Sequence, residues 1–325
     1  MKAICGVLLG IMAGINGVEA KGVRFEESQL HMGTLFRIVV YAESEEAAKS
    51  GLTKAFSRVS KLNSLLSDYL PESELSRLSK SSGSGQNIKV SDELWTVLRT
   101  ADRVSRKSAG AFDVTVGPYA RLWKIARAKR EMPAKERLAM FRDAVGYWQI
   151  EYMPRQQQVC LKAENMFLDL GGIAKGYAAD EALRVLKSVG IPIALIDAGG
   201  DLVLGDSPPD RNGWKIAVGG NVLPDLPVLE LANCAVATSG DTEQFVKING
   251  SRYSHIVNPL TGIGLTNQRQ ATLISPTGIY ADALASTACI LPVCQLEEVL
   301  QMQPQTRAYI VEKNKEGSKS LYQIP

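Results

Sequence analysis

The sequence predicts an α+β fold, a single domain in which mixed or antiparallel sheets pack against helices. Segments with helical periodicity alternate with adjacent pairs of short strands, an arrangement typical of this class. No internal repeat is evident along the 325 residues, and no low-complexity linker is long enough to separate two domains. The composition, 45% hydrophobic and 22% charged, is that of an ordinary globular protein.

The first third of the chain predicts one strand and two helices. Apolar and β-branched residues at 34–42 are typical of a strand. Ser44 is a suitable helix N-cap because two glutamates follow it at the positive end of the helix dipole, and apolar residues recur at helical spacing as far as Leu66. The polar segment 67–84 predicts a surface loop, and a second amphipathic helix is expected at 91–110.

Helices and strands also alternate in the rest of the chain. Residues 123–142, rich in Lys, Arg and Ala, predict an exposed helix, whose basic side we interpret as a solvated face. Two short strands are expected within 147–168, followed by an amphipathic helix with Gly190 as its C-cap. Strands and turns alternate through 193–257, and a last helix is expected at 280–291.

Residues 1–20 predict a cleavable export signal, with the folded domain at 21–325. A positive residue precedes the apolar run 3–15, and Val18-Glu19-Ala20 supplies small or modest residues at the cleavage site. The run is shorter than the ~20 apolar residues that span a bilayer. The alternative is a buried first strand or helix of a cytosolic protein. Cys5 lies inside the apolar run, away from the cleavage point, so a soluble exported (periplasmic) protein is expected rather than a lipoprotein.

Charge and cysteine content exclude some classes of function. Thirty-seven basic and 34 acidic residues leave a net charge of +3, which argues against a nucleic-acid binder that relies on bulk charge. The cysteines show no Cys-x-x-Cys or Cys/His metal spacing, so a zinc site is not expected. An exported compartment permits disulfides, but the sequence leaves their pairing open. The cysteines that remain after the predicted cleavage are Cys160, Cys234, Cys289 and Cys294.

Two glycine-containing stretches are candidates for ligand binding. In 110–118 the first glycine can adopt a positive φ, and Asp113 and Thr115 can either contact a ligand or cap a turn. The stretch 168–176 runs from a strand through two glycines into a helix, so backbone amides and Lys175 can hold an anion. It has neither P-loop nor dinucleotide-binding glycine spacing, yet its pattern favours phosphate binding over a structural turn.

Two further stretches contain hydroxyl and acidic residues. The first, 237–240 followed by 254–262, contains His255, one of only two histidines. A lone histidine beside an Asn-Pro turn is more often structural than catalytic. In the second, Asp282 and Ser286 are four residues apart and therefore share a helix face. Their oxygen atoms suit Mg²⁺, and the alternative is an aspartate that stabilises the helix dipole beside a solvated serine.

Together, and in this order, these stretches resemble the ApbE family of FAD:protein FMN transferases. The resemblance extends from about Met32 to Leu291 and implies a T-fold-like domain. The motifs that carry it are Met32-Gly33-Thr34, Ala111-Phe112-Asp113, the run Asp169-Leu-Gly-Gly-Ile-Ala-Lys-Gly176, Ala198-Gly-Gly-Asp201, Ala237-Thr-Ser-Gly240, His255 with Pro259-Leu-Thr-Gly262, and Asp282-Ala-Leu-Ala-Ser286.

The resemblance implies FAD as substrate and Mg²⁺ as cofactor. Magnesium ligands are implied at the Gly172 carbonyl, the Asp282 carboxylate and the Ser286 hydroxyl. Contacts to FAD are implied at Met32, Tyr69, Ala111, Phe112, Asp113, Asp169, Lys175 and Ile256. The chain departs from the family pattern at Ser286, where Thr is usual, at Asn258 for Asp, at Leu260 for Arg, and at Asp197 for Asn.

The implied reaction is attack by an acceptor Thr or Ser hydroxyl on the riboflavin-side phosphorus of FAD, with release of AMP. Bound Mg²⁺ and Lys175 would neutralise the charge that develops in transfer. We assign His255 as the catalytic residue that positions or deprotonates the hydroxyl, since an imidazole pKa near 6.5 suits that task.

The implied partner is a membrane-bound or exported redox subunit with a Thr or Ser in a short recognition motif. Two alternatives remain open at this point. One is an FAD pyrophosphatase, in which water replaces the protein hydroxyl and yields FMN and AMP. The other is a non-catalytic exported FAD-binding protein.

Overall fold

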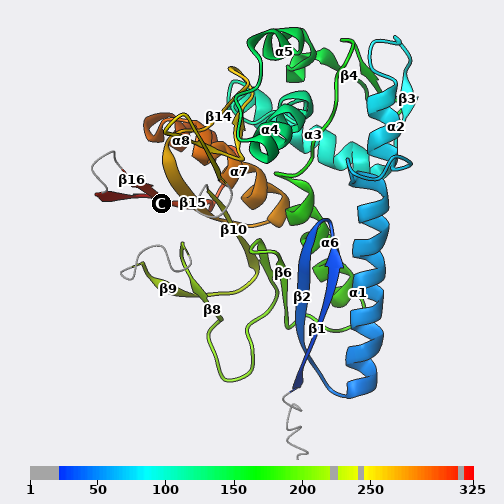
Figure 1. Cartoon of the computed structure of the whole chain (residues 1–325). Coiled ribbons are helices and arrows are strands. Elements are labelled where there is room, and N and C mark those ends of the chain that lie inside the picture. Colours follow the sequence, from blue (N-terminus) through cyan, green and yellow to red (C-terminus); the bar gives the residue numbers. More distant parts are fainter. Residues whose placement is uncertain (1–21, 220–225, 241–244, 314–317) are drawn as a thin grey trace, which may run out of the picture.

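The computed structural model of the chain describes residues 22–219, 226–240, 245–313 and 318–325, so the predicted export signal at 1–20 lies outside the described residues. Within these residues an eight-stranded sheet forms the centre, and neighbouring strands are antiparallel throughout (Figure 1). The predicted α+β class is confirmed. In sheet order the strands are β1 (Val23–His31), β2 (Thr34–Ala42), β6 (Ala194–Ala198), β7 (Leu202–Leu204), β10 (Cys234–Gly240), β15 (Gln268–Ser275), β16 (Arg307–Lys313) and β17 (Lys319–Ile324).

Helices and shorter strands surround this sheet. The helices are α1 (Glu45–Leu66), α2 (Glu74–Lys80), α3 (Asp92–Lys107), α4 (Gly117–Lys129), α5 (Lys135–Met140), α6 (Ala174–Ser188), α7 (Gly278–Ile290) and α8 (Val293–Leu300). The shorter strands are β3 (Ile88–Lys89), β4 (Ile150–Met153), β5 (Gln158–Leu161), β8 (Trp214–Ala217), β9 (Val228–Leu231), β11 (Phe245–Ile248), β12 (Ser251–Ser254), β13 (Val257–Asn258) and β14 (Ile263–Gly264). Among the described helices none is both long and apolar enough to cross a bilayer.

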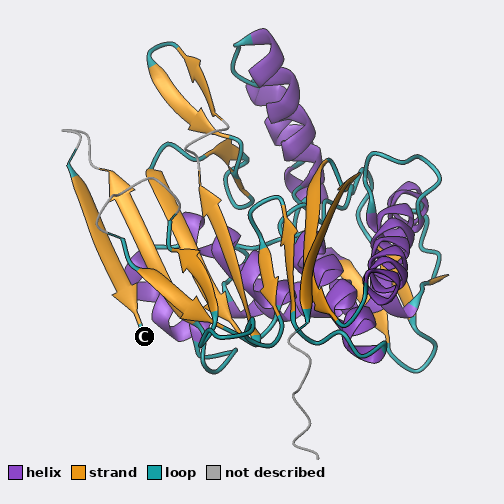
Figure 2. Ribbon diagram, turned by 90° about the horizontal axis from the view of Figure 1, so that it is seen from below, coloured by secondary structure: helices purple, strands orange, loops and turns teal. Residues whose placement is uncertain are grey.

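The central sheet is covered on both faces. Helices α1, α6 and α7 pack on one face (Figure 2), where Phe36 of β2 and Val59 of α1 belong to the same buried cluster. On the other face the ribbon of β8 and β9 places Trp214 in a second buried cluster, which also contains Val39. Successive residues of β2 therefore point into two different cores, which explains the nearly continuous apolar run at 34–42.

The long helices predicted from caps and periodicity are confirmed. Ser44 caps α1 by accepting a hydrogen bond from the Ala47 N–H at 3.1 Å, and Ser91 caps α3 by accepting from the Leu94 N–H at 3.2 Å. After α6, Gly190 adopts a φ of +80°, the left-handed conformation that commonly follows a helix C-terminus.

The structure corrects two predictions for residues 67–142. The expected loop at 67–84 contains α2, which Ser73 caps by accepting from the Ser76 N–H at 2.9 Å. The expected exposed helix at 123–142 is divided, because Arg130 adopts a left-handed φ of 56° and ends α4. Trp123 is only 1% exposed and packs against β11–β12, so α4 has a buried apolar face between its basic residues.

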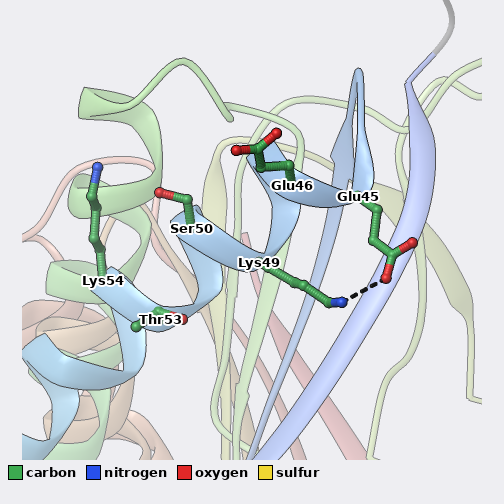
Figure 3. A pocket seen from close by; sticks show the side chains of 6 residues that line it. All are labelled: Glu45, Glu46, Lys49, Ser50, Thr53 and Lys54. Carbon is green, nitrogen blue, oxygen red and sulfur yellow. Dashed lines mark ion pairs between the residues drawn. The ribbon is translucent and has the colours of Figure 1, made fainter.

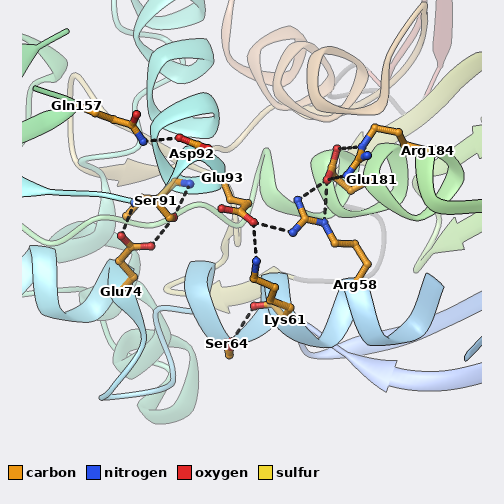
Figure 4. A network of polar contacts seen from close by, with 11 residues as sticks. Arg58, Lys61, Ser64, Glu74, Ser91, Asp92, Glu93, Gln157, Glu181 and Arg184 are labelled. Atoms are coloured by element: carbon orange, nitrogen blue, oxygen red, sulfur yellow. Dashed lines mark hydrogen bonds and ion pairs between the residues drawn. The ribbon is translucent and has the colours of Figure 1, made fainter. Parts of the chain in front are cut away.

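Arg58 ties together α1, α3 and α6 (Figure 4). Its guanidinium donates to Glu93 at 2.6 Å and to Glu181 at 2.8 Å, and Lys61 also donates to Glu93 at 3.1 Å. Burial opposes ionisation of Glu93, but hydrogen bonds from Arg58, the backbone and Lys61 lower its pKa to about 2. The ionised Glu93 is therefore favoured by folding, and its contribution to stability depends on pH.

We expect Glu93→Gln to lower the free energy of unfolding at neutral pH. Because the folded-state pKa lies below the ordinary value of 4.5, the contribution of Glu93 is present above pH 4.5 and is lost as the pH falls towards about 2. Urea unfolding across this range measures the difference between the two proteins, which should shrink with falling pH. Glu72→Gln, at an 86% exposed side chain paired to Lys80 at 3.8 Å, is the control and should show little effect. A difference that stayed constant across the range would contradict the assignment.

Candidate active site

Helices α6 and α7 cross with their backbones in contact, and each caps the other. A Cβ atom on Gly278 would lie 2.5 Å from the carbonyl oxygen of Gly176, so glycine is needed for this approach. Asp180 of α6 accepts hydrogen bonds from the N–H groups of Gly278 at 2.7 Å and Ile279 at 2.9 Å. In return, Asp282 of α7 accepts from the Gly176 N–H at 3.1 Å. The described N-cap residues of both helices lack a side-chain cap, and the two aspartates replace it.

The carboxylate of Asp282 is buried, with 2% of the residue exposed. Burial raises the pKa of Asp282 to about 7 and repulsion from Asp201 adds to the rise, whereas Lys175 and the backbone N–H groups of α6 oppose it. A raised pKa means that the surrounding protein compensates the negative charge only in part. A cation bound beside Asp282 would complete that compensation.

Lys175 places a fixed positive charge next to Asp282. Its ammonium forms an ion pair with Asp201, which precedes β7 and also accepts a hydrogen bond from the Thr238 backbone N–H. Burial opposes protonation of Lys175, but the carboxylates of Asp282 and Asp201 outweigh this and raise its pKa. The charge lies at the N-terminus of α6, where the helix dipole also favours an anion.

The glycine-rich loop before α6 lies against α7. A Cβ atom on Gly172 would lie 2.9 Å from the Ser286 hydroxyl and 3.5 Å from the Phe112 ring, so the loop backbone passes close to both side chains. The Ser286 Oγ is in turn 3.3 Å from the Oγ of Ser239, near the end of β10. Four stretches that are distant in the sequence therefore meet at this point.

The oxygen atoms gathered here fit a small, hard cation. Asp282 offers a carboxylate, Ser286 a hydroxyl, and Gly172 a backbone carbonyl in the adjoining loop. In the part of the chain that the structure describes, no group of three or more His, Cys, Asp or Glu residues could hold a metal ion, so an ion here would also use hydroxyl and carbonyl oxygens. Mg²⁺ accepts such a set, since it often binds through one or two carboxylates and retains several waters.

Asp113 closes a turn beside the glycine-rich loop. One carboxylate oxygen accepts from the Thr115 N–H at 2.8 Å and from the Thr115 hydroxyl at 2.7 Å, and the other accepts from the Tyr147 N–H at 2.7 Å. Burial raises the pKa of Asp113, and these hydrogen bonds oppose the rise. The carbonyl of Val114 accepts from the Asp169 N–H at 2.8 Å, which fixes the turn against the start of the glycine-rich loop. The side chain of Asp113 thus has the turn-capping role that the sequence left open.

An exposed aromatic side chain lies near the same end of the glycine-rich loop, within electrostatic range of Asp169. Tyr69 is 73% exposed, and the Lys124 ammonium lies 4.7 Å from its ring centroid. Burial raises the pKa of the neighbouring Asp68 to about 6, repulsion from Asp169 adds to this, and Arg121 opposes it. Tyr69 and Asp169, from two different segments, are therefore close enough to contribute to one ligand site.

His255 occupies a bend between β12 and β13. The buried Ser254 accepts a hydrogen bond from the Ile256 N–H at 3.0 Å, which turns the chain at His255. The imidazole is half-buried, and Ile256 packs against the main core.

The loop after His255 departs from the family pattern at Asn258 and Leu260, and both residues make contacts in it. The Asn258 side-chain oxygen accepts from the Leu260 N–H at 2.9 Å, the bond that an aspartate would make in the same turn. The Gly262 carbonyl accepts from the Trp123 indole at 2.8 Å. A Cβ atom on Gly110 would lie 3.3 Å from Leu260, so this loop meets the start of the 110–118 stretch.

Met32 lies in the two-residue turn between β1 and β2. Met32 and Gly33 have φ angles of 49° and 74°, as a hairpin turn of this length requires. Thr34, the next residue, contacts Gly199. The register of β2 with β6 therefore places this turn and the connection that contains Asp201 at the same end of the sheet.

The predicted site residues thus fall into two groups. The first forms one cluster: Phe112, Gly172, Lys175, Asp282 and Ser286. The second lies in turns and loops outside this set of contacts: Met32, Tyr69, Ala111, Asp113, Asp169, His255 and Ile256.

Three residues of the cluster received no role from the sequence. Asp201 and Ser239 stand in two of the family-like motifs, but nothing in their spacing indicated contact with Lys175 or Ser286. Asp180 was missed altogether. One signal was available. Aspartate is unfavourable in a helix interior, so its presence there indicates that the side chain makes a tertiary hydrogen bond or ion pair.

A shallow depression along α1 is separate from this site (Figure 3). Its lining residues come from the first turns of α1 and carry exposed charges, including a Lys49–Glu45 ion pair of 2.7 Å. Ion pairs between residues four apart are typical of a solvent-exposed helix face, so we interpret the depression as part of such a face. The lining residues are Glu45, Glu46, Lys49, Ser50, Thr53 and Lys54.

Known proteins share this fold and sequence. The ApbE family matches residues 32–310. The FAD:protein FMN transferase of Treponema pallidum (strain Nichols) is 30% identical over 317 residues, which cover 90% of this chain and 87% of that protein. The FAD:protein FMN transferase of Vibrio cholerae serotype O1 is 30% identical over 293 residues, covering 88% and 86%.

Solved structures agree with these sequence matches. The flavin transferase ApbE from Vibrio cholerae superposes with a TM-score of 0.81 at 27% identity, over 93% of this chain and 97% of that one. The ApbE protein from Thermotoga maritima, 24% identical, shares the fold with a TM-score of 0.79 over 92% and 96%. The fold and the cluster therefore define an enzyme of the flavin transferase class. The chain belongs to the ApbE family.

We expect Gly176→Ala to separate α6 from α7 and to disrupt the cluster. The added methyl would overlap the carbonyl of Gly278, which is backbone and cannot rotate away, so a loss of about 1–3 kcal/mol in the free energy of unfolding is expected. Urea unfolding is the measurement. The control is Gly51→Ala in α1, where the methyl would meet side-chain ends that can rotate, the Cδ1 of Ile191 at 2.5 Å and the Cδ2 of Leu186 at 3.4 Å. Equal stability of the two variants would argue against the close crossing.

Proposed function

We propose that this chain is a Mg²⁺-dependent FAD:protein FMN transferase that attaches FMN to a Thr or Ser hydroxyl of another protein and releases AMP. The observation that carries the proposal is the cluster in which Asp282, Ser286 and Lys175 meet the glycine-rich loop. A carboxylate, a hydroxyl and an ammonium at the N-terminus of α6 suit a magnesium-bound diphosphate. The names of the relatives support the same reaction.

In the proposed step the acceptor oxygen forms a bond to the riboflavin-side phosphorus, and the bond from that phosphorus to the bridging oxygen breaks. AMP leaves with the bridging oxygen and its electron pair, while the hydroxyl proton passes to a base. Gly172, Asp282 and Ser286 would hold Mg²⁺, which when bound would neutralise negative charge on the diphosphate. Lys175, kept in place by Asp201, would contribute a fixed positive charge beside the diphosphate.

The proposal includes an exported location. It rests on residues 1–20, whose composition predicts a secretory signal, and it implies that the acceptor is an exported or membrane-bound redox subunit. The acceptor should therefore come from the membrane or exported proteins of the native host.

The decisive experiment is a transfer assay with purified chain, FAD, Mg²⁺ and separated membrane, exported and cytoplasmic protein fractions of the native host. We expect an FMN-sized mass increase on an acceptor from the membrane or exported fraction, with stoichiometric AMP. Chelation of Mg²⁺ should abolish it. Asp282→Asn should lower the rate by roughly 100-fold, the upper end of the loss seen when even an outer-shell partner of a metal is removed. Asp102→Asn, at another buried carboxylate paired with Arg106 at 2.9 Å on α3, is the matched control.

Other outcomes of this assay decide between the alternatives. Free FMN and AMP without an adduct would indicate an FAD pyrophosphatase. Tight FAD binding without AMP release in Mg²⁺ would indicate a carrier. Labelling confined to the cytoplasmic fraction would contradict the exported location.

For His255 we propose the role of positioning or deprotonating the acceptor hydroxyl. His255 is half-buried and lies at the bend between β12 and β13. His255→Ala should lower the transfer rate by roughly 10²–10⁴-fold, the usual contribution of a general base, with little change in FAD affinity or melting temperature. Rates from the transfer assay and FAD titration measure the two effects. Full activity of the variant would remove His255 from the mechanism.

A further inference from the structure

A hydroxyl from the central sheet contacts the hydroxyl that the proposed ion would use. Ser239 is on β10 and Ser286 is on α7, and their Oγ atoms are 3.3 Å apart. Side chains alternate along β10: the Thr238 hydroxyl pairs with Thr272 at 2.9 Å, whereas Ala237 belongs to the core beneath the helices. Ser239 shares the face of Ala237 and therefore points towards α7.

The contact is unusual for a serine inside a helix. Serine and threonine hydroxyls in helices commonly donate to the carbonyl four residues earlier. Thr287, the next residue, does so, donating to the Ala283 carbonyl at 2.8 Å. Among the hydrogen bonds of the described residues, Ser286 pairs instead with Ser239, across the gap between helix and sheet.

The direction of the Ser286 hydroxyl matters because its oxygen faces the glycine-rich loop. A Cβ atom on Gly172 would lie only 2.9 Å from this oxygen. Serine lacks the second Cβ substituent that restricts χ1 in threonine, so the side chain does not hold this direction by itself. A neighbouring group must select the rotamer.

We propose that Ser239 is the residue that orients Ser286 towards the metal ion. The inference rests on the function proposed above. A hydroxyl that binds a cation uses a lone pair for the ion and directs its hydrogen away from it, so the hydrogen needs an acceptor. With the ion bound, the Ser239 Oγ would accept the Ser286 O–H and leave the Ser286 lone pairs facing the loop at Gly172. Ser239 is thus a positioning residue and not a ligand.

The test is the binding of Mg²⁺ alone to the purified chain, measured by calorimetry and by the shift in melting temperature that Mg²⁺ produces. Ser239→Ala is expected to raise the Kd for Mg²⁺ by roughly tenfold or more, as loss of an outer-shell partner does. Ser239→Thr retains the hydroxyl and should bind nearly as the natural chain does. Ser275→Ala removes a buried hydroxyl from a similar pair, with Thr306 at 2.9 Å, and should leave the Kd unchanged.

A double-mutant cycle separates positioning from other roles. If Ser239 acts only through Ser286, then Ser239→Ala should have no further effect on the Kd in a Ser286→Ala background. Additive effects would mean that Ser239 is a ligand itself or supports the fold generally, and would overturn the inference. An unchanged Kd in Ser239→Ala would overturn it as well. Failure of the natural chain to bind Mg²⁺ would instead remove the proposed function on which the inference rests.

Discussion

Reciprocal capping of α6 and α7 is the constraint on which the site depends. Asp180 bonds the first amides of α7 and Asp282 bonds an early amide of α6, so neither helix can slide without leaving buried N–H groups unpaired. The resulting register sets Asp282 at the start of α6 and Ser286, one turn later, against the glycine-rich loop. At the other end of α7, Arg269 donates to the Ala288 carbonyl at 3.0 Å. The helix is held at both ends, and the site along it is preorganised.

The charges of this rigid cluster do not balance. Asp201 and Asp282 share the single ammonium of Lys175, and Asp282 carries a pKa raised to about 7 as a result of burial and of Asp201. A buried charge that lacks full compensation costs stability, and apolar residues of similar size would serve packing better. Perturbed acidic groups with a specific charged neighbour are typical of functional sites. In the proposed reaction the metal ion restores the balance on the carboxylates, and Lys175 remains available to the diphosphate.

Features that depend on local chemistry could be predicted from the sequence. Caps and apolar spacing located α1 and α3, and the four-residue spacing of Asp282 and Ser286 placed both oxygens on one face of α7. Elements that depend on their partners in the fold and not on a local pattern were missed. Strand β1 contains Arg24, Glu26 and Glu27 and is recognised only by its pairing with β2, and α8, β16 and β17 follow the last predicted helix. The same holds within the site. Asp180 contacts Gly278, 98 positions away in the sequence, and Ser239 contacts Ser286, 47 positions away. No local sequence pattern indicates contacts over such separations.

A preorganised cluster serves a protein substrate only if one side of it is open. Tyr69 and Leu260 are 73% and 62% exposed, and each borders a segment that leads to the cluster. Tyr69 is within electrostatic range of Asp169, and a Cβ atom on Gly110 would lie 3.3 Å from Leu260. Single exposed apolar residues are common on proteins, but these two flank the loops around Gly172. In the proposed reaction an acceptor hydroxyl can therefore approach along these loops while α6 and α7 keep their contact. The rigid pair of helices α6 and α7 then stabilises the charge, and the loops admit the acceptor.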